Sequence, residues 1–314
     1  MKPLSRLFLF LLLPLASPAL TSSLPLRLVS FNIRYAATTL LASELPWSSP
    51  TCSTAPLTCR RPHVTSHLLN ITTTTTSAPT LLSLQEVLAS QLTDLTAALG
   101  PTWSSLGTGR DDGFTHGEYV PILYDTSRLR CLSSTTKWLS PAPDIPSLGW
   151  GAATKRIVTL GVFETRSFLP GFGKRFLVAN THPDHKSGEA RTEGLKVAIA
   201  QVQETLRRLG PMGVVLAGDF NSVRGAEAHK ALSEGGYLEE LFDVASAEGK
   251  VRGTNRATAT GWVAGGKTSW IDFLWVGPKG EGKWTVQGYE ILDNVEKGVY
   301  FSDHRAVVGD VTLV

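Results

Sequence analysis

Short apolar runs recur along the whole chain, and most of them end at a polar residue. The runs that predict strands cover residues 26–32, 80–87, 119–124, 136–139, 156–164, 176–180, 214–218, 270–276, 286–292 and 305–314. Helical spacing follows the second run, from Leu88 to Leu99, and returns over residues 189–209, with a shorter helix expected at 63–70 and a long loop at 36–60. Because strands both alternate with helices and follow one another directly, we expect mixed sheets covered by helices, in one domain over residues 24–314.

One of these strands ends in a pair of residues that can carry chemistry. Residues 214–217 predict a buried strand, and Gly218 is expected to let the backbone turn at its end. Asp219 and Asn221 then point to the same side, because residues two apart in an extended chain do so. A carboxylate can hold a metal ion or take a proton from water, and an amide can donate to a phosphate oxygen. An Asx turn that closes the strand is the alternative interpretation.

Further polar residues stand at or within predicted strands in the same manner. They are Asn32, Glu86, Glu118, His182, Asp272 and the pair Asp303-His304. Asp272 is the most informative, because it lies inside the apolar run Ile-Asp-Phe-Leu-Trp and burial of an unpaired carboxylate costs several kcal/mol. It therefore needs a partner, such as a histidine. Each residue alone is compatible with a cap, a turn or a satisfied core group. The whole series predicts one shared site.

The order of these motifs along the chain resembles that of a known protein family. The motifs are Phe31-Asn32-Ile33-Arg34, Leu84-Gln85-Glu86-Val87, Gly117-Glu118-Tyr119, Asn180-Thr181-His182, Gly218-Asp219-Phe220-Asn221, Ile271-Asp272-Phe273 and Ser302-Asp303-His304. The series resembles the endonuclease/exonuclease/phosphatase superfamily over nearly all of residues 26–314, and most closely a branch of secreted and bacterial proteins. The resemblance implies a DNase I-like four-layer α/β sandwich of two packed mixed β-sheets flanked by helices. It also implies a phosphate ester hydrolase with a divalent metal ion, usually Mg²⁺.

The resemblance assigns the metal ion, the attacking water and a phosphate oxygen to five residues. Glu86 would be the principal metal ligand, supported by Asn32 and Asp303. These hard oxygen donors suit Mg²⁺ or Mn²⁺. Asp219 would orient or deprotonate the attacking water, and Asn221 would hold a phosphate oxygen.

Two histidines would complete the site. His304, paired with Asp272, would contact the phosphate, and His182, paired with Glu118, would be a second acid or base. Each carboxylate would raise the pKa of its histidine, because it stabilises the imidazolium. Three arginines are candidates for binding phosphate, with ordinary ion pairs as the alternative: Arg34, Arg156 and Arg191.

The first residues of the chain predict export. Lys2 and Arg6 precede a short apolar run, and small residues follow, so we expect a signal peptide over residues 1–19. An exported protein can carry a glycan at Asn70, in the acceptor Asn-Ile-Thr beside a threonine run that suits an exposed loop. It can also keep a disulfide, and Cys52 with Cys59 is our tentative pairing among three cysteines.

Composition leaves the substrate open. Without Lys2 and Arg6 the chain has 28 basic and 27 acidic residues, a net charge of +1, which offers no global attraction for nucleic acid. A nucleic acid, a phospholipid and a sugar or inositol phosphate all remain candidate substrates. An apolar lip for a lipid would come from Trp138, Leu139, Trp150, Phe168, Leu169 and Phe172. We expect a monomer with no stable protein partner. The competing hypothesis is a secreted binding protein that keeps the scaffold without catalysis.

Overall fold

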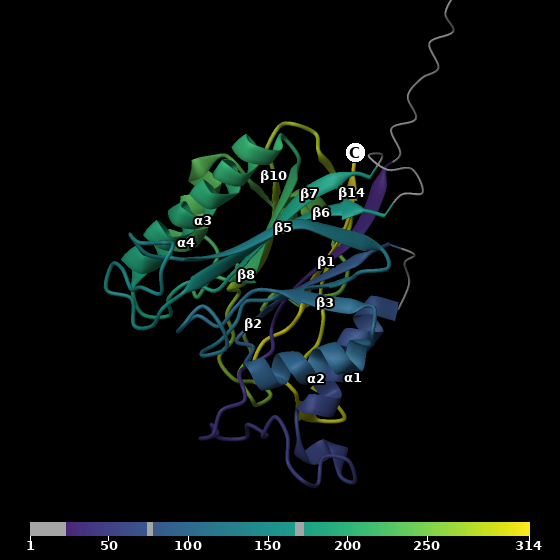
Figure 1. The fold of residues 1–314 in the computed structure, drawn as a ribbon. Coiled ribbons are helices and arrows are strands. Elements are labelled where there is room, and N and C mark those ends of the chain that lie inside the picture. The colour runs from purple at the N-terminus through teal and green to yellow at the C-terminus, as the bar shows by residue number, and fades with distance from the viewer. Residues whose placement is uncertain (1–22, 74–77, 167–172) are drawn as a thin grey trace, which may run out of the picture.

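Two six-stranded sheets packed face to face form the centre of the molecule (Figure 1). The computed structural model describes residues 23–73, 78–166 and 173–314, so the expected signal peptide lies outside the described residues. The first sheet has the order β11 (Trp284–Ile291), β14 (Val307–Leu313), β1 (Leu24–Asn32), β2 (Thr80–Gln85), β4 (Ile122–Asp125) and β3 (Trp103–Leu106). The second has the order β5 (Leu129–Trp138), β6 (Ile157–Thr165), β7 (Arg175–Thr181), β8 (Gly213–Asp219), β10 (Asp272–Gly277) and β9 (Glu239–Glu240).

Both sheets are mixed. β1 and β2 run parallel, as do β7 and β8, while the other neighbouring pairs are antiparallel. Because β1 pairs with β14, the two ends of the described chain lie in one sheet. A separate pair of short strands, β12 (Val295–Glu296) and β13 (Val299–Tyr300), lies outside both sheets.

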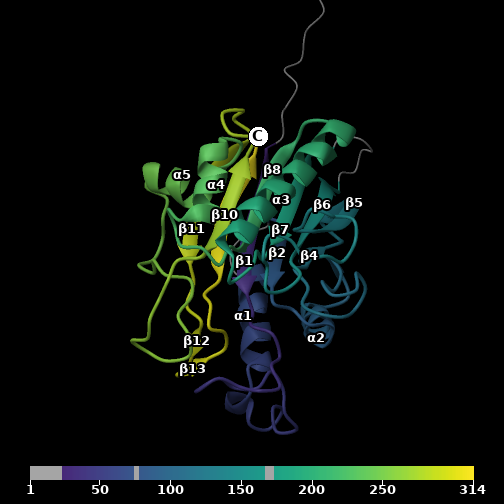
Figure 2. The same ribbon diagram turned by 90° about the vertical axis from the view of Figure 1, so that its left-hand side faces the viewer.

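Helices cover the outer face of each sheet, which gives four layers. α1 (Arg61–Thr73) and α2 (Ala89–Leu99) pack on the first sheet, and α3 (Gly188–Leu209) and α4 (Glu227–Gly235) pack on the second (Figure 2). α5 (Leu241–Ala247) contacts β10 and β11, and a 3₁₀ turn, Pro56–Thr58, precedes α1. The predicted sandwich of two packed mixed sheets is confirmed.

Side-chain alternation along the strands produces this layering. On β1, Leu28 points into the core between the sheets, whereas Val29 points toward α1 and α2. On β8, Val215 points into the same core and Val214 points toward α3. Successive residues of a strand face opposite sides, so a strand covered on both faces is apolar throughout.

Several boundaries differ from the sequence prediction. The strand expected at 136–139 runs from Leu129 to Trp138, whereas the strand expected at 119–124 begins only at Ile122. β3, α4 and α5 were not predicted. Asn70 is exposed but lies in the last turns of α1 rather than in a loop. The tentative pairing of Cys52 with Cys59 is a disulfide in the structure, and Cys131 is free.

Candidate active site

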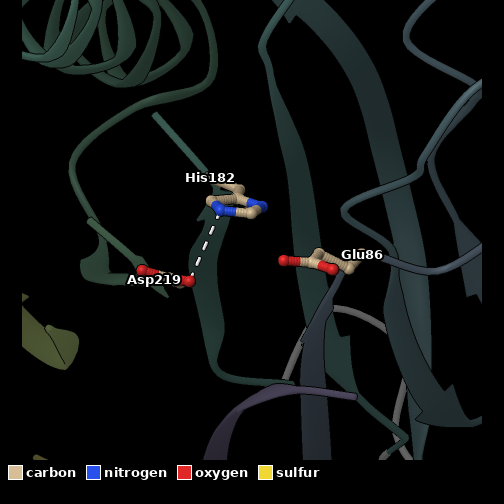
Figure 3. A group of neighbouring side chains, drawn as sticks. All are labelled: Glu86, His182 and Asp219. Atoms are coloured by element: carbon tan, nitrogen blue, oxygen red, sulfur yellow. Dashed lines mark ion pairs between the residues drawn. The ribbon is translucent and has the colours of Figure 1, made fainter. Parts of the chain in front are cut away.

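The polar residues predicted from the strand ends meet at one edge of the sandwich. β1, β2, β7 and β8 bring their carboxyl ends to this edge, and the antiparallel strands β10 and β14 begin there. Figure 3 shows the result for three residues: Glu86, which follows β2, faces His182, which follows β7, and Asp219, which ends β8. The site is therefore shared between the two sheets.

Asp219 is the buried centre of the cluster. Its Oδ1 accepts the backbone N–H of Asn221 at 2.9 Å, and its Oδ2 accepts from Asn32 Nδ2 at 2.9 Å. Asp272 stands directly opposite on β10, so two carboxylates face each other across an antiparallel pair. Burial, together with the charge of Asp272, raises the pKa of Asp219 to about 7. A carboxylate with this pKa can accept a proton near neutral pH.

Gly218 has a different role from the predicted turn. A Cβ at this position would lie 2.2 Å from the carbonyl oxygen of Thr181 on β7. Only glycine fits this close approach of the two backbones. The close packing brings the end of β8 against the end of β7, and therefore brings Asp219 beside His182.

His304 and Asp272 form the predicted pair. Nδ1 of His304 lies 2.9 Å from Oδ2 of Asp272, and Nε2 lies 3.7 Å from Oδ2 of Asp219. Burial opposes protonation, but the charges of Asp272 and Asp219 outweigh it and raise the pKa of His304 well above its usual value. The imidazolium therefore persists at neutral pH, with its Nε2–H toward the centre of the cluster.

The predicted pair of His182 with Glu118 is wrong. Glu118 accepts a hydrogen bond from Arg110 at 2.7 Å, so its carboxylate is already paired. His182 instead lies 2.8 Å from Nδ2 of Asn221 and 3.4 Å from Oδ2 of Asp219. Burial, with the positive charges of Arg156 and Arg110, lowers the pKa of His182 well below its usual value. The predicted rise in pKa therefore holds for His304 and fails for His182.

Asn221 also differs from expectation. The two hydrogens of its Nδ2 are directed to His182 Nε2 and to the carbonyl oxygen of Pro183, at 2.8 and 3.1 Å. With both donors engaged, the amide anchors the neutral imidazole rather than facing a phosphate oxygen. Since the amide donates, Nε2 of His182 accepts and Nδ1 carries the proton.

The residues expected to hold a metal ion lie next to one another. Burial opposes ionisation of Glu86, but the hydrogen bond from Asn32 at 3.0 Å and the charges of His304 and Arg34 lower its pKa. Burial and the charge of Glu86 raise the pKa of Asp303, whose buried Oδ1 has no hydrogen-bond partner among the described residues. The carboxylates of Glu86 and Asp303 repel each other, and one oxygen of Asp303 lacks a hydrogen-bond partner among the described residues. Such a pair is suited to bind a divalent cation through its oxygens. Glu86, His182 and Asp219 also place one ligand atom each within 4.8 Å of the others.

Asn32 does not present its oxygen to such a cation. Its Oδ1 accepts the backbone N–H of Arg34 at 2.9 Å, and its Nδ2 donates to both Glu86 and Asp219. The amide joins the two carboxylates across the two sheets. Its predicted role as a ligand is therefore replaced, in this structure, by that of a bridging donor.

The backbone is strained at three positions of the site. Arg34, Glu86 and Asn221 have φ values of 60°, 58° and 48°, in the left-handed region that side chains other than glycine rarely adopt. Each such residue costs about 1–3 kcal/mol, and the surrounding structure must maintain it. Three of the six positions with such φ values among the described residues, glycines apart, therefore lie at the polar cluster.

A cavity of about 390 Å³ opens beside the cluster. It is lined by Arg34, Tyr35, Glu86, Arg110, Glu118, Thr154, Arg156, His182, His185 and Asn221. Asp219, Asp272, Asp303 and His304 are not among these lining residues, and Asp219 lies 3.4 Å from His182, which is one of them. The cavity places a positively charged wall next to the metal-fitting carboxylates.

The three predicted phosphate-binding arginines differ in position. Arg34 and Arg156 line the cavity, and Arg34 also contacts Glu44 at 3.1 Å and Glu86 at 3.6 Å. Arg191 is outside the lining on α3, where it pairs with Glu227 and donates to the carbonyl oxygen of Asp184. For Arg191 the ordinary ion pair is the correct interpretation.

Four cavity residues were not predicted: Tyr35, Arg110, Thr154 and His185. His185 lies in the motif Asn-Thr-His-x-Asp-His and could have been found there, whereas nothing in the sequence marks Arg110 or Thr154.

The proposed apolar lip is not supported where it can be assessed, because Trp138 and Leu139 are buried and Trp150 is only partly exposed. Its other members, Phe168, Leu169 and Phe172, lie outside the described residues.

Comparisons with known proteins find matches to both the sequence and the fold. The family model described as Endonuclease/Exonuclease/phosphatase family matches residues 29–304. An endonuclease/exonuclease/phosphatase from Bacteroides vulgatus is 28% identical with a TM-score of 0.74, covering 92% of this chain and 99% of that chain. A mannosyl-6-phosphatase from Bacteroides thetaiotaomicron is 25% identical with a TM-score of 0.73, covering 91% and 99%.

A curated relative matches over a shorter stretch. Uncharacterized protein L388 of Acanthamoeba polyphaga mimivirus is 31% identical over 106 residues, which are 32% of this chain. The match spans about a third of the length of that relative, 36%.

Across residues 23–73, 78–166 and 173–314, every helix is too short or too polar to cross a membrane.

Proposed function

This chain belongs to the endonuclease/exonuclease/phosphatase family, and from this premise we propose that it is an exported, divalent-metal-dependent phosphatase for small, polyhydroxylated phosphate esters. The observation that carries the proposal is the convergence, beside one cavity, of a carboxylate poised near neutral pH, a buried imidazolium and two metal-fitting carboxylates. These are the groups needed to activate water, stabilise charge on phosphorus and bind a divalent cation.

The residues divide the reaction among them. Glu86 and Asp303 would hold a divalent cation, which would supply positive charge to stabilise the phosphoryl group. Asp219 accepts the proton of the attacking water, since its pKa of about 7 suits a general base. His304, held by Asp272, donates Nε2–H to a phosphoryl oxygen as negative charge develops there.

His182 supports this arrangement as a neutral group. Its Nε2 is fixed by Asn221, and its ring lies between Asp219 and the cavity. Burial and the neighbouring arginines keep it uncharged, so it adds no positive charge that would stabilise the anionic form of Asp219. This preserves the basicity of Asp219.

The cavity favours a small substrate over a polymer. Its volume of about 390 Å³ lies in the range of small-molecule sites. Its wall combines the donors of Arg110 and Arg156 with the carboxylate of Glu118 and the hydroxyl of Thr154, a set that can bind several hydroxyl groups. The likeness to a mannosyl-6-phosphatase adds support for a sugar phosphate.

A direct assay tests the proposal. We expect p-nitrophenyl phosphate and hexose 6-phosphates to be hydrolysed with Mg²⁺ or Mn²⁺, and activity to be lost in EDTA. His304→Ala should abolish most of this activity. Faster hydrolysis of bis-p-nitrophenyl phosphate, DNA, RNA or sphingomyelin would contradict the substrate class. No hydrolysis of any of them would favour the inactive binding protein.

Export is a separate part of the proposal. It rests on the basic and apolar start of the sequence, and the Cys52–Cys59 disulfide is of the kind that persists in oxidising compartments. The expected product lacks residues 1–19 and, from a eukaryotic host, carries a glycan on the exposed Asn70. Mass spectrometry of the protein from culture medium would reveal both, and an intact Met1 on a cytosolic product would contradict export.

A further inference from the structure

A buried arginine, Arg60, lies outside the predicted site and contacts the backbone segments that support the site. Arg60 is fully buried and donates Nη1 to the carbonyl oxygen of Ile33 at 2.9 Å and Nη2 to that of Tyr35 at 3.0 Å. Both terminal nitrogens also reach the carbonyl oxygen of Arg34 at 3.3 Å, and Nη1 reaches that of Phe301 at 3.3 Å. One guanidinium therefore joins the segment after β1 to the segment that leads into Asp303.

The segment that Arg60 holds is the one that orients Glu86. Oε2 of Glu86 accepts the backbone N–H of Tyr35 at 3.3 Å and lies 3.6 Å from the guanidinium of Arg34. Its other oxygen accepts from Asn32, whose Oδ1 is held by the backbone N–H of Arg34. Every one of these contacts depends on the backbone of residues 32–35.

This backbone needs external support. Arg34 has a φ of 60°, which is unfavourable for an arginine and persists only where neighbouring groups maintain it. The carbonyl oxygens on either side of this residue, and its own, are those that accept from Arg60. Gln91 adds a further donor to the carbonyl oxygen of Arg34 at 3.0 Å.

Arg60 is itself fixed by the segment before α1, which lies beside α1 at one end of the molecule in Figures 1 and 2. It follows Cys59 of the disulfide, and its Nε donates to the carbonyl oxygen of Leu45 at 2.9 Å. Glu44, whose side chain is also fully buried, lies 3.9 Å from Arg60 and 3.1 Å from Arg34. Burial lowers the pKa of Arg60 to about 10, so the guanidinium remains charged at neutral pH.

We propose that Arg60, together with Glu44, is a positioning pair that sets the orientation of Glu86 and the position of Asp303, and thereby the affinity of the site for a divalent cation. The inference rests on the proposed function for the identity of the ligand. Arg60 touches neither substrate nor cation, and acts through the backbone of residues 33–35 and 301. Groups that orient metal ligands from outside typically contribute 10- to 100-fold to metal affinity.

Calorimetric titration with Mn²⁺ tests this role without any substrate. Arg60→Lys keeps the charge but replaces the planar fork by a single nitrogen, which cannot reach these carbonyl oxygens together. We expect its Mn²⁺ dissociation constant to rise about 10- to 100-fold, and the amide of Tyr35 to exchange with solvent at least about tenfold faster, because its contact with Glu86 loosens. Asp310→Asn is the matched control, since Asp310 belongs to a buried arginine pair at the opposite end of β1, with Arg27.

The outcomes separate the two proposals. Wild-type dissociation constants in Arg60→Lys, with unchanged exchange at Tyr35, would overturn the role of Arg60. If Arg60→Lys does not fold, Glu44→Gln decides, because it keeps Arg60 and removes the buried charge beside Arg34. An unchanged Mn²⁺ affinity in Glu44→Gln would then overturn the positioning pair. If the wild type binds no Mn²⁺, or Glu86→Gln binds it equally well, the proposed metal site fails instead.

Discussion

The pair of His304 with Asp272 gives the sharpest test of the proposed chemistry. Asp272→Asn keeps the shape of the side chain but removes the charge that faces His304 Nδ1 at 2.9 Å. A hydrogen bond to a charged group contributes about 1.5–3 kcal/mol. If the transition state loses all of it, kcat falls roughly 10- to 150-fold, at 1.36 kcal/mol per factor of ten. His304→Ala removes the donor itself and should cost more, about 10²–10⁴-fold.

The same substitution shifts two pKa values in a known direction. The charge of Asp272 raises the pKa of His304, so its removal lets His304 lose its proton at a lower pH. That charge also raises the pKa of Asp219, so the base ionises at a lower pH in the variant. Both changes move the pH–rate profile of Asp272→Asn toward acid, with a new loss of rate as pH rises through the lowered pKa of His304.

The assay is the hydrolysis of p-nitrophenyl phosphate at saturating Mg²⁺ between about pH 5 and 9, with unfolding followed in parallel. Asp310→Asn again serves as control, since it removes a buried aspartate far from the cavity and should leave kcat and the pH profile unchanged. A wild-type kcat and pH profile for Asp272→Asn would refute the assignment of His304 as the charged donor. An equal loss of rate in both variants would point to stability as the cause.

Three further outcomes are expected. Glu86→Gln should lose most activity at normal Mg²⁺ with little change in melting temperature in EDTA, because only the cation-binding charge is removed, and full activity would exclude Glu86 as a ligand. His182→Ala should lower kcat about 100-fold while the protein stays folded, because Asp219 and Asn221 lose a group that positions them, as measured by single-turnover kinetics and circular dichroism. The contacts of Asp310 with Arg27 and Arg252 outweigh burial and lower the pKa of Asp310. Asp310→Asn should therefore lower the free energy of unfolding by about 3 kcal/mol at neutral pH, and this difference from wild type should shrink as pH falls below about 4. A difference in urea unfolding that stays constant with pH would contradict the ion pair.

Much of the site was predictable because its residues interrupt apolar patterns. A carboxylate inside the run around Asp272, or directly after a valine-rich strand at Asp219, is costly unless it has a partner. The carboxyl ends of parallel strands meet at one edge of a sheet, so polar residues at several strand ends converge there independently of the loop conformations. The same reasoning gave Asp272 a partner such as a histidine, and the family resemblance identified that histidine as His304.

The wrong predictions concern which side chains pair with one another in the site. Glu118 was assigned to His182, but Arg110, eight residues earlier on the same loop, occupies its carboxylate. Nothing in the pattern distinguishes that arginine from one at the surface. Burial and the positive charges of Arg156 and Arg110 lower the pKa of His182, and Glu118, which is paired with Arg110, does not offset them.

Periodicity predicted most of the strands, the helices α2 and α3, the mixed character of the sheets and most residues of the cluster, because burial and secondary structure impose patterns within a few neighbouring positions. Only the tertiary structure decided that Asn32 bridges two carboxylates, that Gly218 serves close packing, and that Arg60 supports a strained turn from 26 residues away. Such contacts join segments that are distant along the chain at separations of about 3 Å. Hydrogen bonds of this kind depend on loop geometry, for which local sequence carries no periodic signal.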